Sequence, residues 1–255
     1  MSIVMGTAEN VVTPLRPPAG APHRRQLRLP GQTHAAEGPH DLSGMYMAHH
    51  AFRRDLADFA AAARRTPVDD AGTWAALAVR WERFAHVLHH HHTVEDTTLW
   101  PQLLELVDAA GDDAARATLE AMEAEHRLID PLLTACAEGF ATMASAPDAQ
   151  VAERLAEHTA AARDTLAAHL RHEETEALPL LQAHLSAGGW QLVEDAAAEG
   201  SGPRDLPFFV PWGAKGLDDA ALDRAVELFG KPMRVVLWLF RGRFERGERI
   251  AFRHV

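Results

Sequence analysis

Two stretches of the sequence share one spacing of histidine, acidic residue and proline. The first copy, HHTVEDTTLWP, starts at His91 and contains Glu95; the second, HLRHEETEALP, starts at His169 and contains Glu173. Both fit H-x-x-x-E-[DE], with a proline six residues after the glutamate. Residues four apart on a helix lie on one face, one turn apart. Each stretch therefore offers an imidazole and a carboxylate to the same small volume.

These side chains carry the donor atoms of a transition-metal site. Imidazole nitrogen and carboxylate oxygen without thiolate suit Fe, Mn, Zn or Ni. A carboxylate can bridge two ions while each histidine caps one, so two such helices that face each other can form a dinuclear centre. Two further segments supply matching groups: MAHHAFRRDL contains His49 and His50, and EAEHRLIDP contains Glu125, His126 and Asp130.

The alternative is that these polar residues are simply solvated. A single H-x-x-x-E is common on exposed helix faces. Two copies with a shared proline, and histidines in both other segments, favour a metal, because buried polar pairs without one would be costly to desolvate. The run HHHH at residues 89–92 covers a full helical turn, so it cannot all point inward. We expect His91 in register, His92 at the rim, and His89 and His90 solvated or packed.

Four helices are expected to position these residues. Apolar residues at helical spacing predict the first helix over about 41–64 and the third around 119–133. The second is expected from about 73 to Pro101, where the proline ends or kinks it. The fourth is expected over about 148–185, and the SAGGW sequence closes it. Four long helices joined by short loops predict an all-α, up-down-up-down four-helix bundle over residues 41–188. Trp74, Trp81 and Phe84 are expected in its core.

The two flanks of the bundle differ from it in composition. Residues 1–40 are rich in Pro, Gly and Arg without periodicity, which predicts a flexible arm. Residues 189–255 are expected to form a helical C-terminal extension: DLPFFVPWG as a loop, then shorter helices around Ala220–Phe229 and Pro232–Phe240. MRVVLWLF followed by RGRFERGER is apolar and then basic, as in a helix that binds a membrane surface or a partner. We favour packing across the bundle, with PFFVPWG as the strap.

Composition narrows the possible partners and location. A formal net charge of -11 argues against nucleic acid. The single cysteine, Cys136, excludes an intramolecular disulfide or a cysteine-based metal cluster, and one thiol fits a reducing cytoplasm; we expect it to be a small core residue. The N-terminus does not have the pattern of a signal peptide, and no apolar run approaches the ~20 residues of a transmembrane span.

Over about residues 41–185 the chain resembles the hemerythrin-like family, also called HHE cation-binding domains. The resemblance lies in the two H-x-x-x-E units with their prolines and in the histidines of the first and third helices. It implies a centre of two non-haem iron ions (Fe-O-Fe type) inside the four-helix bundle. It also implies Glu95 and Glu173 as bridges. The implied ligands are His49, His91, Glu95, His126, His169 and Glu173.

Two departures from the family pattern bear on function. The O₂-carrying hemerythrins have a second histidine one turn before the third-helix histidine, where this chain has Met122. Their fourth helix has its acid five residues after the histidine, whereas both Glu173 and Glu174 are acids here. The ligand set of this chain is closer to that of the carboxylate-richer HHE branch of the family, which argues against simple reversible O₂ carriage. The residues left open as further ligands are His50, His92, Asp130 and Glu174.

Two functions remain open at this point. One is a protein that binds or senses O₂, nitric oxide or iron. The other is a di-iron enzyme that acts on peroxide or activates O₂ to oxidise a small substrate, with Met122 leaving an open coordination position. A ferritin-like centre ranks below both, because it needs Glu-x-x-His on two helices and the chain has it once in the bundle, at Glu123–His126.

Overall fold

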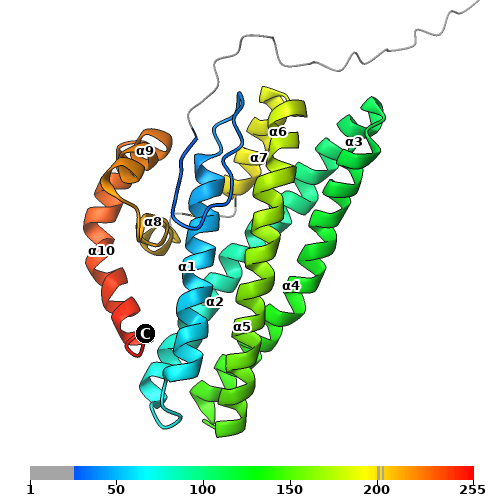
Figure 1. The fold of residues 1–255 in the computed structure, drawn as a ribbon. Helices are drawn as coiled ribbons and strands as arrows, with labels where there is room; N and C mark the ends of the chain where they lie inside the picture. Colours follow the sequence, from blue (N-terminus) through cyan, green and yellow to red (C-terminus); the bar gives the residue numbers. More distant parts are fainter. Residues whose placement is uncertain (1–25, 200–201, 203) are drawn as a thin grey trace, which may run out of the picture.

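Four long helices lie side by side in the computed structural model, which describes residues 26–199, 202 and 204–255. Figure 1 shows α5 between α1 and α4, with α2 on the far side against α4. They are α1 (Ser43–Arg65), α2 (Ala71–Val94), α4 (Asp113–Ser145) and α5 (Ala149–His172). Among the described residues there is no strand, so the all-α prediction is confirmed.

Aspartates begin three of these helices. Asp70 accepts a hydrogen bond from the backbone N–H of Thr73, and Asp112 and Asp148 cap α4 and α5 in the same way. Such caps satisfy backbone donors that a helix start leaves without partners. The turn before α4 is closed by Gly111, whose φ of 68° is left-handed and suits glycine. Local sequence thus fixes the short connections.

The second and fourth helices do not stop at their prolines. A π-helical turn, η1 (Glu95–Leu99), leads from α2 into α3 (Trp100–Ala110), and η2 (Glu173–Ala177) leads from α5 into α6 (Leu178–His184). The prediction that Pro101 ends or kinks the helix is therefore replaced by a continuous, locally widened helix. A proline ring clashes with the carbonyl one turn earlier, and an extra residue in the turn gives it room.

Each π turn begins at one of the paired glutamates. The backbone N–H of Trp100 reaches back to the carbonyl of Glu95, and that of Leu178 reaches back to Glu173, five residues in each case. Because π turns in helices often occur at functional sites, their position marks the region around these glutamates.

The core consists of two hydrophobic clusters with a polar layer between them. One contains Phe52, Phe84 and Phe140, and the other contains Tyr46 and Met122. On α1, α2 and α4 the histidine of interest lies between residues of the two clusters, as His126 does between Met122 and Ile129, and on α5 His169 lies beside Leu170, before the chain reaches Ala177 of the second cluster. The histidines therefore lie deep inside the molecule.

The N-terminal segment departs from the predicted flexible arm where it is described; residues 1–25 lie outside the described part. Leu27 and Leu29 are buried with Met47 of α1. The side chain of Gln182 holds the segment by donating to the carbonyls of Ala36 and His40. Buried leucines and these side-chain contacts account for the order of residues 26–40.

The C-terminal extension is more helical than predicted. SAGGW does close the fourth helix, but α7 (Ala187–Glu199) starts within it, and DLPFFVPWG forms helix α8 (Leu206–Ala214) instead of a loop. Two more helices follow, α9 (Asp219–Phe229) and α10 (Pro232–Ala251), the last running well past residue 240. A proline in the first turn of α8 is compatible with a helix, since the N–H it lacks has no intrahelical acceptor there.

The extension packs against the bundle, as the sequence favoured. Figure 1 shows α8 lying between α1 and α10. Trp212 of α8 is fully buried in the same cluster as Phe52 and Phe84. Within the described residues no helix is long and apolar enough to cross a membrane.

Candidate metal centre

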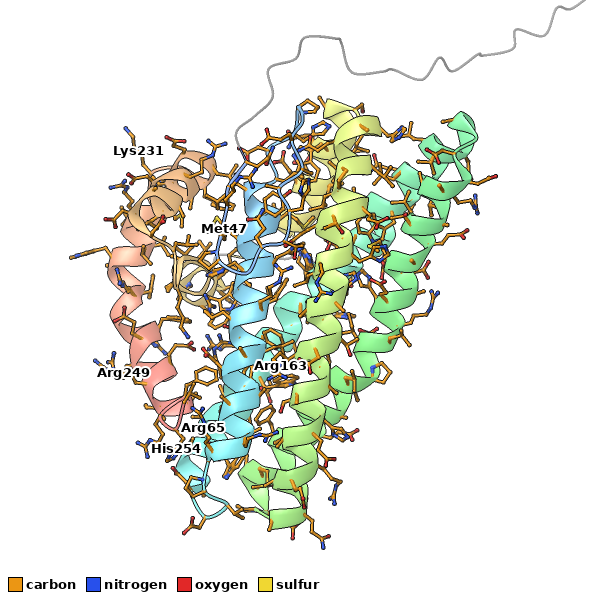
Figure 2. The ribbon with its side chains drawn as sticks, in the orientation of Figure 1. Met47, Arg65, Arg163, Lys231, Arg249 and His254 are labelled. Carbon is orange, nitrogen blue, oxygen red and sulfur yellow. The ribbon has the colours of Figure 1, made fainter. Side chains whose placement is uncertain are left out.

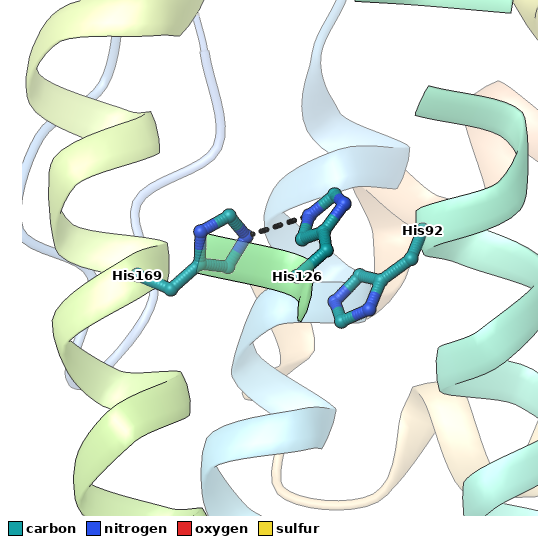
Figure 3. Close-up of side chains that lie close together, drawn as sticks. All are labelled: His92, His126 and His169. Carbon is teal, nitrogen blue, oxygen red and sulfur yellow. Dashed lines mark hydrogen bonds between the residues drawn. The ribbon is translucent and has the colours of Figure 1, made fainter. Parts of the chain in front are cut away.

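Seven buried or nearly buried side chains from four helices converge in the polar layer. They form two groups, and within each group one donor atom per residue lies within 4.8 Å of all the others. The first group is His49, His91, Glu95 and Glu173. The second group is His92, His126 and His169, shown in Figure 3. The structure thus brings all six sequence-predicted ligands together and adds His92.

The two glutamates lie between the groups. One oxygen of Glu95 is 3.1 Å from His91 Nε2, and the other is 3.5 Å from His126 Nε2. Glu173 Oε2 is 3.3 Å from His49 Nε2 and 3.9 Å from His169 Nε2. Each carboxylate therefore faces histidines of both groups, which is the placement a bridging ligand needs.

Many polar atoms in this layer are buried without a hydrogen-bond partner. They include His49 Nε2, His91 Nε2, both ring nitrogens of His92, and all four carboxylate oxygens of Glu95 and Glu173. Some of these atoms are close in distance but not in hydrogen-bonding geometry. Buried polar groups are nearly always satisfied, because leaving them unpaired costs free energy. A donor set of this kind fits metal cations.

Carboxylates outside the two groups orient three of the histidines. His49 Nδ1 donates to Glu174 Oε1 at 3.0 Å. His126 Nδ1 donates to Asp96 at 2.8 Å, and His169 Nδ1 donates to Glu125 at 2.8 Å. A proton held at Nδ1 leaves the Nε2 lone pair directed inward, which is the arrangement common to metal-binding histidines.

The close approach of the His126 and His169 rings also indicates a metal-binding site. Figure 3 shows His126 Nε2 and His169 Nε2 facing each other, 3.1 Å apart. With both Nδ1 atoms carrying protons toward carboxylates, these two nitrogens are both acceptors in the neutral rings. His92 stacks on His126 with 3.9 Å between ring centroids. A shared cation satisfies three such lone pairs at once.

Burial favours neutral imidazoles at His91 and His92, whereas the carboxylates around His49 favour its charged form. Burial lowers the pKa of His91 to about 3, and burial together with His126 lowers the pKa of His92 well below its usual value. Burial alone would lower the pKa of His49, but the charges and hydrogen bonds of Glu173 and Glu174 outweigh burial and raise this pKa to about 9. A neutral imidazole is the form that binds metal, so His49 would lose a proton when a cation binds.

The two glutamates compete for negative charge. Burial, together with the nearby charge of Glu173, raises the pKa of Glu95 well above its usual value. Burial would also raise the pKa of Glu173, but the neighbouring His49 outweighs burial and lowers this pKa to about 2. Two buried carboxylates this close cannot both ionise easily without added positive charge. Metal cations would supply that charge.

The residues left open by the sequence have different positions. His92 belongs to the second group, whereas Glu174 lies behind His49, where it also accepts from Arg53 at 2.7 Å. His50 points to the carbonyl of Pro30, and Asp130 is exposed. Neither of these two is in the groups.

Sequence reasoning missed Asp96 and Glu125 as orienting carboxylates, although one signal was present. The second acid of each H-x-x-x-E-[DE] repeat, Asp96 or Glu174, holds a histidine of another helix. The repeat therefore encodes two roles, with the first acid facing the centre and the second fixing a histidine. Glu125, which also accepts from His172 at 2.8 Å, has no comparable sequence signal.

One comparison with known proteins gave a match. The family model described as the hemerythrin HHE cation-binding domain matches residues 40–181, more than half of the chain. The match covers every residue of the two groups and ends within α6, before α7 to α10. No curated protein and no solved structure matches the chain.

Proposed function

The chain belongs to the hemerythrin HHE cation-binding family, and on that premise we propose that it is a non-haem di-iron protein that binds or senses O₂, nitric oxide or iron. The observation that carries the proposal is the pair of donor groups that share two glutamates. A mononuclear site needs no carboxylate between two sets of histidines. We place the protein in the cytoplasm, because its single, buried thiol suits a reducing compartment.

Each proposed iron has its own histidines. His49 and His91 would hold one ion, and His92, His126 and His169 would hold the other. Glu95 and Glu173 would be the ligands that the two ions share. Iron is favoured over zinc because the ion at His92, His126 and His169 would have five protein donors once both glutamates are shared, one more than the tetrahedral set that zinc prefers. When bound, the iron pair would supply redox-active positions for a small ligand.

The surrounding residues protect and orient this centre. Glu174, Asp96 and Glu125 accept the Nδ1 protons of their histidines, which turns the Nε2 atoms of these rings toward the centre. On the His91 side the ring of Phe52 lies 5.1 Å from the imidazole and shields it from water. The apolar surroundings suit a small, uncharged diatomic ligand.

The proposal includes an up-down-up-down course of the four long helices. Its support is the order of the clusters along the chain. α1 runs from the Tyr46 cluster to the Phe52 cluster, α2 runs in the opposite sense, and α4 and α5 repeat the alternation. Short connections between antiparallel neighbours produce this order.

An enzymatic role is the second candidate, and the unequal donor sets favour it. The ion at His49 and His91 has two histidines, whereas its neighbour has three. Fewer protein donors leave room for an exogenous ligand such as peroxide or O₂. Met122, one turn before His126, is fully buried and offers no strong ligand in place of a histidine.

Metal analysis of protein purified without a histidine tag tests the centre. Anaerobic iron loading should give close to two irons per chain. His92→Ala should lower the ratio toward one, and His91→Ala or His169→Ala should lose most of the iron. His89→Ala is the matched control, because His89 is exposed and belongs to neither group. A wild-type ratio near one, preferential retention of zinc, or equal losses in all four variants would contradict the di-iron proposal.

Stopped-flow mixing separates the two functions. Reduced, iron-loaded protein is mixed with O₂, nitric oxide or peroxide while the absorption spectrum is recorded. A band that forms on mixing and reverses when the ligand is removed supports binding or sensing. Repeated consumption of peroxide or O₂ by a small amount of protein supports the enzyme instead.

A further inference from the structure

Helix α10 has one face on the bundle and one apolar stripe in solvent. Met233 and Ala251 are buried on the inner face. On the outer face Val235, Trp238 and Leu239 are exposed by 58%, 80% and 55%. Their spacing of three and four residues places them on one side of the helix. The most exposed large aromatic side chain of the described residues thus lies in this stripe.

The stripe continues toward the C-terminus as arginines. Arg246 lies two turns beyond Leu239, and Arg249 three turns beyond Trp238. Residues 231–255 contain seven Lys or Arg and two acids, in a chain whose net charge is -11. Figure 2 shows Lys231 and Arg249 at the outer edge of the molecule, on the side away from α5. An acidic protein therefore has one positive, partly apolar surface, which we call the α10 stripe (Val235, Trp238, Leu239, Arg246 and Arg249).

The two acids of α10 leave this surface with a net positive charge. Glu248 is buried toward the bundle, where it accepts from Arg80 at 2.6 Å and from Lys215 at 2.9 Å. Glu245 accepts from Arg241 at 2.7 Å and lies 4.0 Å from Arg249, while Arg246 is exposed. The contacts of Glu248 fix α10 on the bundle, so exposure of the stripe does not come from a loosely attached helix.

We propose that the α10 stripe binds the surface of a membrane that contains anionic lipids. Tryptophan and aliphatic side chains partition into the boundary between headgroups and acyl chains, and arginines along the same face bind lipid phosphates. Charge complementarity decides the occupant. A second copy would bring two positive stripes together, which like charges oppose. Nucleic acid would meet the negative field of the rest of the chain.

The full-length protein can be tested by co-sedimentation with vesicles. Phosphatidylglycerol mixed with phosphatidylcholine supplies the anionic surface, and pure phosphatidylcholine is the neutral comparison. We expect binding to the anionic vesicles that weakens as salt is raised, because the arginine contacts are screened. Trp238→Ala, and separately Arg246→Glu with Arg249→Glu, should weaken binding about tenfold or more, since charges near an anionic surface each contribute substantially.

Matched controls lie on α4. Leu128 is 66% exposed, and Arg127 is an exposed arginine, so Leu128→Ala and Arg127→Glu change the same properties elsewhere. Both controls should bind like the wild type. Thermal melting of all variants checks that each one is folded.

Tryptophan fluorescence gives a second readout. Among the six tryptophans Trp238 is 80% exposed, Trp190 is partly buried, and Trp74, Trp81, Trp100 and Trp212 are buried. Vesicle binding should shift the emission to shorter wavelength and protect it from an aqueous quencher. Trp238→Phe keeps an aromatic ring, so it should keep most binding while losing the spectral shift.

Three results would overturn the proposal. The first is failure to bind anionic vesicles at low salt. The second is equal binding to neutral vesicles, or binding that Trp238→Ala and the arginine reversal leave unchanged. The third is a concentration-dependent dimer that Trp238→Ala abolishes, which would assign the stripe to a second copy of the chain. Iron content plays no part in these measurements, so the di-iron proposal stands or falls separately.

Discussion

One buried carboxylate joins the C-terminal extension to the bundle. Asp55 of α1 is fully buried and accepts from Arg80 of α2, from Arg54, and from the indole N–H of Trp212 at 2.7 Å. Burial by itself would raise the pKa of Asp55, but Arg80 and Arg54 outweigh it and hold that pKa below its usual range. Arg80 also donates to Glu248 of α10, so α1, α2, α8 and α10 meet at one ionic network.

Asp55→Asn should destabilise the protein through Arg80. Asparagine has nearly the same size and can still accept the Trp212 N–H, but it leaves the buried guanidinium with Glu248 alone. Removing one partner of a buried ion pair costs about 3–5 kcal/mol. Because Arg80 keeps one carboxylate, we expect the lower end, about 3 kcal/mol. For a chain of this size that lowers Tm by roughly 6–12 °C.

Thermal and urea unfolding followed by circular dichroism measure the change. Asp58→Asn, about one turn further along α1, is the control. The Asp58 side chain is 25% exposed and pairs with Lys215 at 3.0 Å, so its loss should cost less than about 1 kcal/mol. Since the folded-state pKa of Asp55 lies below 3.8, its contribution is present above pH 3.8 and is lost as the pH falls through the folded value. Equal shifts for the two variants would refute this account.

Three further outcomes are expected. Deleting the residues after Leu206 should lower solubility and Tm by exposing the cluster that Trp212 covers; an unchanged Tm in calorimetry would rule out a stabilising role. Glu174→Gln should weaken iron binding about 10–100-fold in a chelator competition, because it removes the charge behind His49, while exposed Glu176→Gln should not; similar losses would discount the orienting role. Burial raises the pKa of Cys136 to about 12, so a thiol reagent should label it only in denaturant; rapid native labelling would disprove its burial.

Helical periodicity correctly predicted the features that depend on the sequence of a single helix. The four-residue spacing of His91 and Glu95 fixes their common face, and the matching pair on the fourth helix follows from the same rule. The core position of Trp81 and Phe84 follows from their apolar spacing in the same helix, and both are fully buried. These inferences needed no knowledge of neighbouring helices.

The remaining features depend on several helices at once. His92 lies about 100° around the helix from His91, so it reaches the centre because His126 of α4 and His169 of α5 lie against its ring. Helix α8 was predicted as a loop because of its prolines and aromatics, but burial of Trp212 against the bundle outweighs weak helix propensity. The order of residues 26–40 likewise rests on distant partners such as Gln182.

The two π turns set the rotational phase of the helices that carry them. An extra residue turns every later side chain by about 100° relative to an uninterrupted α-helix. Because of that offset Glu95 faces the polar layer while Trp100, Leu103 and Val107 still point into the second cluster. A residue inserted into this segment without further widening of the turn would rotate that cluster's side chains by about 100° and carry them out of the second cluster. The length of the segment and the width of its turn are therefore coupled, and the same applies between Glu173 and Pro179.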